Sequence, residues 1–176
     1  MNMKAEKVTL EGLDISEKNI LIHPPVDSYK EVIHQLGALL FENGYVKDSF
    51  IQAVLDREEI FPTGLEVSSG GGVAIPHADA EHVKESALGV AKLATPVGFG
   101  AMGEPDKTIS VDIVLMLAIA DPEKTVIVLR KVILILENIE ALQALKNASS
   151  KGEVQMNIIE HIQSLDREIN EGASQH

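Results

Sequence analysis

The feature that most constrains the fold is a nearly continuous apolar run from Val111 to Ile119, interrupted only by Asp112. Val, Ile and Leu dominate the run, which is typical of a strand buried on both faces of a sheet. Hydrophobic residues make up 45% of the chain and aromatic residues only 3%, so the core must be built mainly from aliphatic side chains. The run therefore predicts a central strand in a layered, aliphatic core.

Helical and extended segments alternate around this run. Short strands are predicted at 19–23, 72–75 and 86–93, with a loop at 102–107. Apolar residues at helical spacing predict helices over 28–43, 48–58, 121–136, 139–147 and 151–165. We therefore expect an α/β fold, a single-domain α/β sandwich with a mixed or largely parallel sheet of about five strands flanked by helices.

The chain divides into three parts by composition. Residues 1–18 are polar and of mixed charge, which predicts a poorly ordered N-terminal extension. Residues 19–168 have the length and apolar content of one domain. Residues 169–176 are polar and predict a flexible tail.

The chain is acidic and contains no cysteine. Its formal net charge of −12 repels phosphate backbones and anionic membranes, so we expect no nucleic-acid partner. No apolar run reaches the roughly 18 residues of a membrane span, and no signal peptide is recognisable, so no direct membrane insertion is expected. Together with the lack of cysteine, these features predict a cytoplasmic protein. Cysteine catalysis and thiolate metal sites are excluded.

The segment from Gly70 to Asp79 is the strongest candidate for a functional site. Three glycines lead into a short apolar strand that ends at Pro76, and His77 follows immediately. Proline fixes its own φ and biases Ile75 towards an extended conformation, so the imidazole is presented from a stiff strand end. A neutral imidazole can attack phosphorus or act as a base. The alternative is a turn histidine hydrogen-bonded to backbone.

Two residues upstream of the glycines could bind a phosphoryl group beside His77. The Arg57 guanidinium can pair with two phosphate oxygens, although it could equally be a surface charge among acidic neighbours. The Thr63 hydroxyl could donate a hydrogen bond to phosphate, although an ordinary turn is the simpler interpretation. A metal site at His77, Asp79 and His82 lacks any known ligand pattern, and a serine hydrolase lacks its G-x-S-x-G turn. We therefore expect no metal and no cofactor.

Several spaced motifs resemble one protein family. The stretch Gly72-Val73-Ala74-Ile75-Pro76-His77 resembles the active-site motif of the phosphotransferase-system (PTS) EIIA components of the fructose–mannitol type, PTS EIIA type-2. The elements Arg57-Glu58-Glu59 and Phe61-Pro62-Thr63-Gly64-Leu65 upstream are similar to those of the same family. Downstream, the apolar strand and the helix that begins at Asp121 follow in the family's order. The resemblance covers about residues 20–165, so it identifies 19–168 as the EIIA domain.

The form Phe-Pro-Thr-Gly-Leu is most similar to the galactitol-specific branch. Mannitol- and fructose-type members often carry a second histidine early in the helix after the apolar strand. Thr125 stands at that place here, as expected for the galactitol branch. The resemblance therefore implies that no second imidazole binds the phosphoryl group from this position.

The resemblance implies a phosphotransferase that works through a phosphohistidine. His77 would accept a phosphoryl group from phospho-HPr and pass it to a cysteine of the EIIB partner. EIIB would then phosphorylate a galactitol-like sugar alcohol or related sugar arriving through the membrane component EIIC. Arg57 and Thr63 would stabilise the phosphoryl group. No Mg²⁺ is needed, because donor and acceptor are imidazoles of similar leaving ability.

Two further expectations concern partners. Phe61, Leu65, Val67 and Met102 could form the apolar centre on which HPr and EIIB dock. The alternative function is a regulatory EIIA-like module of nitrogen-type phosphotransfer signalling, in which the phosphorylation state of the same histidine controls partner proteins.

Overall fold

The computed structural model describes residues 9–173, and a long antiparallel hairpin forms the centre of the sheet. Its strands, β6 (Ala87–Ala101) and β7 (Glu104–Ala118), are 15 residues long each. Beyond β7, β5 (Gly72–Ala74) pairs in parallel, and β4 (Leu65–Glu66) then pairs antiparallel with β5. The functional-site motif therefore lies beside the buried central strand.

Three short strands complete the sheet on the other side of the hairpin. β2 (Leu13–Asp14) and β3 (Ile20–Ile22) pair with β6 in parallel, and β1 (Thr9–Leu10) pairs antiparallel with β2. The described residues thus form one seven-stranded sheet in the order β1-β2-β6-β7-β5-β4, with β3 also on β6. The mixed sheet is confirmed. The three strands that were not predicted, β1, β2 and β4, have only two residues each, too short for a periodic pattern to show.

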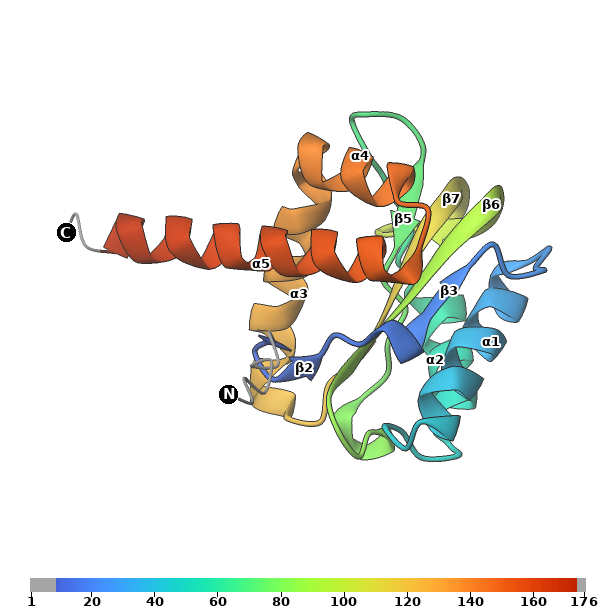
Figure 1. Ribbon diagram of the computed structural model, residues 1–176. Coiled ribbons are helices and arrows are strands. Elements are labelled where there is room, and N and C mark those ends of the chain that lie inside the picture. The colour runs from blue at the N-terminus through green and yellow to red at the C-terminus, as the bar shows by residue number, and fades with distance from the viewer. Residues whose placement is uncertain (1–8, 174–176) are drawn as a thin grey trace.

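Helices cover both faces of the sheet, as the α/β sandwich requires. α1 (Tyr29–Glu42) and α2 (Phe50–Ile60) lie on one face, while α3 (Thr125–Glu137), α4 (Ile139–Asn147) and α5 (Lys151–Ala173) lie on the other (Figure 1). The 3₁₀ helices η1 (Glu17–Asn19), η2 (Ala80–His82) and η3 (Pro122–Lys124) lie in connections. Ser28 caps α1 by accepting a hydrogen bond from the Glu31 N–H.

β7 is buried on both faces, which confirms the interpretation of the apolar run. Leu115 and Leu117 pack into the core cluster that includes α3, α4 and α5. Val114 and Met116 pack into the cluster that includes α1 and α2. This alternation follows from the two-residue period of a strand.

The loop expected at 102–107 is shorter than predicted, because β7 already begins at Glu104. Only Met102 and Gly103 separate β6 from β7, and Gly103 has a φ of 78° that suits the turn. Pro96 lies within a register shift between Lys92 and Val97, where a strand tolerates proline. Proline and glycine in this stretch therefore mark an irregular hairpin rather than its end.

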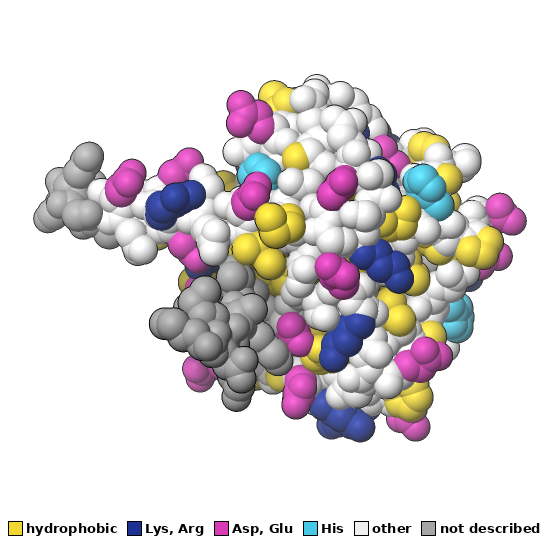
Figure 2. Space-filling model, in the orientation of Figure 1, with side chains coloured by type: hydrophobic (Ala, Val, Ile, Leu, Met, Phe, Trp, Pro, Cys, Tyr) yellow, Lys and Arg dark blue, Asp and Glu magenta, His cyan; other side chains and the backbone are white. Residues whose placement is uncertain are grey.

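The ends of the domain also differ from expectation. The described residues 9–18 form β1, β2 and the start of η1, and Leu13 and Ile15 are buried in the core. Residues 1–8 of the expected extension lie outside the described residues. α5 continues to Ala173 rather than ending near Leu165, and its last turns stand clear of the body (Figures 1 and 2). A helix that has left the core needs no apolar stripe, so the pattern could not locate its end. Residues 174–176 of the expected tail are likewise outside the described part.

None of the described helices combines the length and the apolar character needed to cross a lipid bilayer.

Candidate functional site

His77 lies just past the end of β5, where hydrogen bonds to β7 hold its backbone. The Leu117 N–H donates to the carbonyl of Pro76 at 3.1 Å, and His77 forms a parallel bridge with Leu117. Only 8% of His77 is exposed. The histidine is therefore placed by the sheet rather than by a free loop.

The hydrogen bonds of the His77 ring determine which nitrogen carries the proton. Nδ1 lies 2.8 Å from the carbonyl oxygen of Ile75, and a carbonyl only accepts, so Nδ1–H is the donor. Nε2 has no hydrogen-bond partner among the described residues and reaches the surface. The neutral ring therefore presents an unprotonated Nε2 to a visiting group.

Burial keeps the His77 ring neutral. Desolvation is the largest effect and lowers the pKa of His77, while the Ile75 hydrogen bond opposes it. The positive charge of Arg57 lowers the pKa further, and Asp79 acts in the opposite direction. The ring is therefore less easily protonated than an ordinary histidine.

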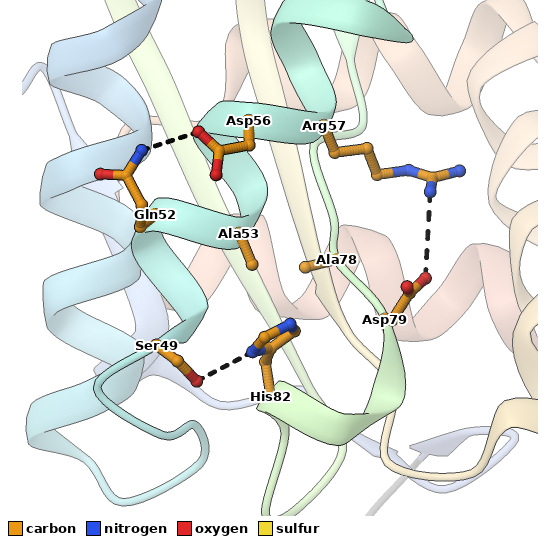
Figure 3. Close-up of a pocket in the computed structure, with 8 residues that line it drawn as sticks. All are labelled: Ser49, Gln52, Ala53, Asp56, Arg57, Ala78, Asp79 and His82. Atoms are coloured by element: carbon orange, nitrogen blue, oxygen red, sulfur yellow. Dashed lines mark hydrogen bonds and ion pairs between the residues drawn. The ribbon is translucent and has the colours of Figure 1, made fainter.

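Arg57 comes to the same place from the C-terminal part of α2. Its Nη1 lies 3.9 Å from Oδ1 of Asp79, and its guanidinium lies 5.7 Å from the centre of the Phe61 ring. Figure 3 marks the Arg57–Asp79 ion pair with a dashed line. Its Nε is buried and has no hydrogen-bond partner in the described part of the chain. The arginine thus keeps N–H groups available for an anion.

A cavity of about 430 Å³ opens between α2 and the segment that follows His77. Arg57 and Asp79 lie at one end of it, and His82 lies at the other (Figure 3). Nδ1 of His82 is 2.8 Å from Oγ of Ser49. Within residues 9–173, no group of three or more His, Asp or Glu side chains could hold a metal ion.

Thr63 is near the site but buried behind it. Its hydroxyl lies 3.0 Å from both carboxyl oxygens of Glu58, and the Ile75 N–H donates to Oγ1 at 3.1 Å. The single hydroxyl hydrogen is therefore directed at Glu58. In this arrangement Thr63 offers no free donor for a direct hydrogen bond to phosphate, and it contacts the backbone that holds His77 instead.

No functional role was predicted for Glu58 from the sequence. Only 4% of it is exposed, and it accepts hydrogen bonds from both the N–H and the hydroxyl of Thr63. Burial raises its pKa to about 7, although the Thr63 bonds and the Arg57 charge act in the opposite direction. Only the spacing of five residues between Glu58 and Thr63, across the end of α2, could have indicated their contact. Such a spacing is too common to be specific.

The chain matches one family model over most of its length. The model describes the phosphoenolpyruvate-dependent sugar phosphotransferase system, EIIA 2, and matches residues 15–161.

Two curated relatives show what the chain is similar to. One is the transcriptional regulator ManR of Bacillus subtilis, 38% identical over 96 residues that cover 54% of this chain and 13% of the regulator. The other is the galactitol-specific EIIA component of the PTS of Escherichia coli, 32% identical over 100 residues that cover 57% of this chain and 65% of that protein. The match thus spans less than two thirds of either relative.

Two solved structures of the mannitol enzyme IIA of Escherichia coli have similar folds. The crystal structure has a TM-score of 0.66 and 26% identity, over 81% of this chain and 96% of that one. The complex with phosphorylated enzyme IIB also has a TM-score of 0.66, with 24% identity over 85% of this chain and 96% of that one. The family model, the shared α/β fold and the histidine motif agree: the chain belongs to the type-2 EIIA family of the sugar phosphotransferase system.

Proposed function

We propose that this protein is a phosphoryl carrier of a sugar phosphotransferase system. His77 takes a phosphoryl group from the phosphohistidine of HPr and passes it to a cysteine of EIIB. The observation that carries the proposal is the free Nε2 of His77, whose partner nitrogen donates its proton to Ile75. Membership of the EIIA family supports the same reaction.

The transfer needs no proton movement at His77. The Nε2 lone pair attacks phosphorus as the nitrogen–phosphorus bond of the donor breaks, and that electron pair returns to the donor imidazole. Nδ1 keeps its proton throughout. The Ile75 carbonyl at 2.8 Å stabilises the positive charge that the ring gains on attack. In the second step a thiolate of EIIB attacks phosphorus, and the pair returns to Nε2.

Arg57 is the proposed partner of the phosphoryl oxygens. Its Nε lacks a hydrogen bond among the described residues, and its ion pair with Asp79 is long. The guanidinium can therefore turn to the phosphoryl group at a small cost in free energy. A positive charge at this place offsets the charge on the transferred group.

Partner docking is proposed around two exposed apolar side chains, one beside Arg57 and one at the hairpin turn. Phe61 is 64% exposed next to Arg57, and Met102 is 40% exposed at the hairpin turn. Leu65 and Val67 are half-buried and pack against the core. Phe61 and Met102 therefore offer more contact area to HPr or EIIB than the other two members of the expected rim.

The finer proposal is a galactitol-like sugar alcohol as the transported substrate. The Phe-Pro-Thr-Gly-Leu form and the identity to the galactitol component support it. The second candidate function, a regulatory module, is supported by the similarity to ManR. In that case the phosphorylated histidine would signal to a partner rather than supply EIIB.

Intact mass after incubation with phospho-HPr tests the carrier function. We expect the gain of one acid-labile phosphoryl group, absent in His77→Ala and retained in His34→Ala, a control at an exposed histidine of α1. An unmodified wild-type protein would overturn the proposal. Transfer onward to a galactitol-type EIIB, faster than to a mannitol-type EIIB, would support the finer proposal. Transfer to neither would favour the regulatory function.

A further inference from the structure

We propose that Glu58 and Thr63 act as positioning residues for His77: the Glu58 carboxyl orients the Thr63 hydroxyl, which anchors Ile75 so that its carbonyl holds the Nδ1 proton. The inference rests on the proposed function only for its kinetic consequence. Its structural part concerns the tautomer of the ring and can be measured without any partner protein.

The Thr63 side chain takes the place of a backbone hydrogen bond that is missing where the β4–β5 pairing ends. β4 and β5 pair with Leu65 opposite Val73, and the same register continued by two residues places Thr63 opposite Ile75. The main chain has turned away at that point, because both the N–H and the carbonyl of Gly64 bond to the β6–β7 hairpin. The Ile75 N–H therefore bonds to the Thr63 side chain instead, at 3.1 Å.

Glu58 leaves the Thr63 hydroxyl with one orientation. Above its pKa of about 7, Glu58 is an ionised carboxylate that only accepts hydrogen bonds, and both of its oxygens lie 3.0 Å from the hydroxyl oxygen. The hydroxyl hydrogen therefore points to Glu58, and the oxygen lone pairs point to the Ile75 N–H. The Thr63 N–H, 2.8 Å from the same carboxyl, fixes the threonine backbone as well.

The anchor matters because of the proline that follows. Pro76 has no N–H, so the peptide unit that carries the Ile75 carbonyl cannot be held by a donor of its own. Thr63 holds this segment on one side, and the bond from Leu117 to the Pro76 carbonyl holds it on the other. Without the Thr63 bond, the carbonyl can drift from His77, and the proton is then free to move to Nε2.

Keeping Glu58 ionised at this buried position costs free energy. Burial raises the pKa of its carboxyl to about 7 despite two bonds from Thr63, so the ionised form is disfavoured there. A buried carboxyl with a strongly raised pKa, linked through Thr63 to the backbone that holds His77, is more typical of a functional site than of a core. Among the described residues, Thr63 is the hydrogen-bond partner of Glu58, which points to the orienting role.

The test measures the His77 tautomer by long-range ¹H–¹⁵N correlation spectra near pH 8, where the ring is neutral. In wild type we expect the Nδ1–H form. Thr63→Val removes the hydroxyl at nearly constant volume, and we expect the ratio of Nδ1–H to Nε2–H to fall at least about threefold. Glu58→Gln should also lower this ratio. Thr63→Ser, which keeps a hydroxyl, should have the wild-type ratio.

Matched controls separate positioning from general loss of stability. Thr95→Val and Glu59→Gln make the same chemical changes at exposed residues, and neither should shift the tautomer. If Thr63→Val does not fold, Glu58→Gln and Thr63→Ser carry the test. An unchanged tautomer ratio in both Thr63→Val and Glu58→Gln would overturn the proposal.

The rate of transfer from phospho-HPr gives the second readout. It should fall with the tautomer ratio in Thr63→Val and recover in Thr63→Ser. If wild-type protein accepts no phosphoryl group but the tautomer still shifts, the proposed function fails and the positioning role stands. If wild type accepts it and the tautomer is insensitive to both variants, the carrier function stands and the positioning role fails.

Discussion

At the scale of single residues, His77 has the protonation state that its proposed chemistry needs. Desolvation lowers its pKa below the usual 6.5, so Nε2 is less easily protonated than in an ordinary histidine. We expect an NMR titration of the His77 Cε1–H to give a midpoint below 6.5. A midpoint at or above 6.5 would contradict the effect of burial.

Arg57 should matter for transfer and little for stability. Arg57→Ala removes the proposed phosphate partner, and loss of such a group typically slows a reaction about 100-fold or more. Its ion pair with Asp79 is long and exposed, so the free energy of unfolding should change by less than about 1 kcal/mol. Rapid-quench transfer from phospho-HPr and urea unfolding measure the two effects.

The control for this variant is Arg130→Ala, which removes an exposed arginine of α3. It should leave both quantities unchanged. Transfer at the normal rate in Arg57→Ala would remove Arg57 from the site.

At the scale of elements, the three-residue strand β5 determines where His77 lies. A Cβ added at Gly72 would lie 2.6 Å from both the Ser110 carbonyl oxygen and Cγ2 of Ile109, so β5 approaches β7 only because this residue is glycine. We expect Gly72→Ala to lower the free energy of unfolding by about 1–3 kcal/mol, measured by urea unfolding.

Gly89→Ala in β6 is the matched control for Gly72→Ala. Its added Cβ would find neighbours at 3.5 Å, an ordinary contact distance, so stability should change little. Equal losses in the two variants would show that a general intolerance of strand alanine, rather than the close approach of β5, causes the effect.

The elements also show how far sequence reasoning reaches. Helices such as α1 and α4 were predictable because an apolar stripe and a cap residue are local signals. The stiff backbone before His77 was predictable because Pro76 restricts the conformation of Ile75, the residue before it. The role of Glu58 was not, because it depends on the chain folding back until Thr63 meets both the end of α2 and Ile75. Such a tertiary contact produces no periodic pattern in the amino-acid sequence.

At the scale of the whole molecule, the net charge of −12 should steer partners with a basic face. We expect the second-order rate constant for transfer from phospho-HPr to fall about tenfold between roughly 0.05 and 0.5 M salt, because surface charges are then screened. The first-order step within the complex, measured at saturating carrier, should change little. A second-order constant that does not respond to salt would contradict electrostatic steering.

The stability of the whole molecule should depend on pH through Glu58. Its pKa is about 7 in the folded state and 4.5 as a free side chain, so the folded state holds the proton over a range in which the unfolded chain has lost it. Stability from this group is therefore full below pH 4.5 and is lost as pH rises through 7. The shift corresponds to about 3 kcal/mol.

Other groups, His77 included, also change stability with pH, so the prediction concerns the difference between two proteins. Between pH 5 and pH 8, wild type should lose about 2.5 kcal/mol more stability in urea unfolding than Glu58→Gln, which cannot ionise. Glu59→Gln, the exposed neighbour, should follow the wild-type profile. Parallel profiles for wild type and Glu58→Gln would mean that the carboxyl is already ionised in the folded protein. Since an ionised Glu58 orients the Thr63 hydroxyl at least as firmly, that result would leave the tautomer measurement as the deciding test of its role.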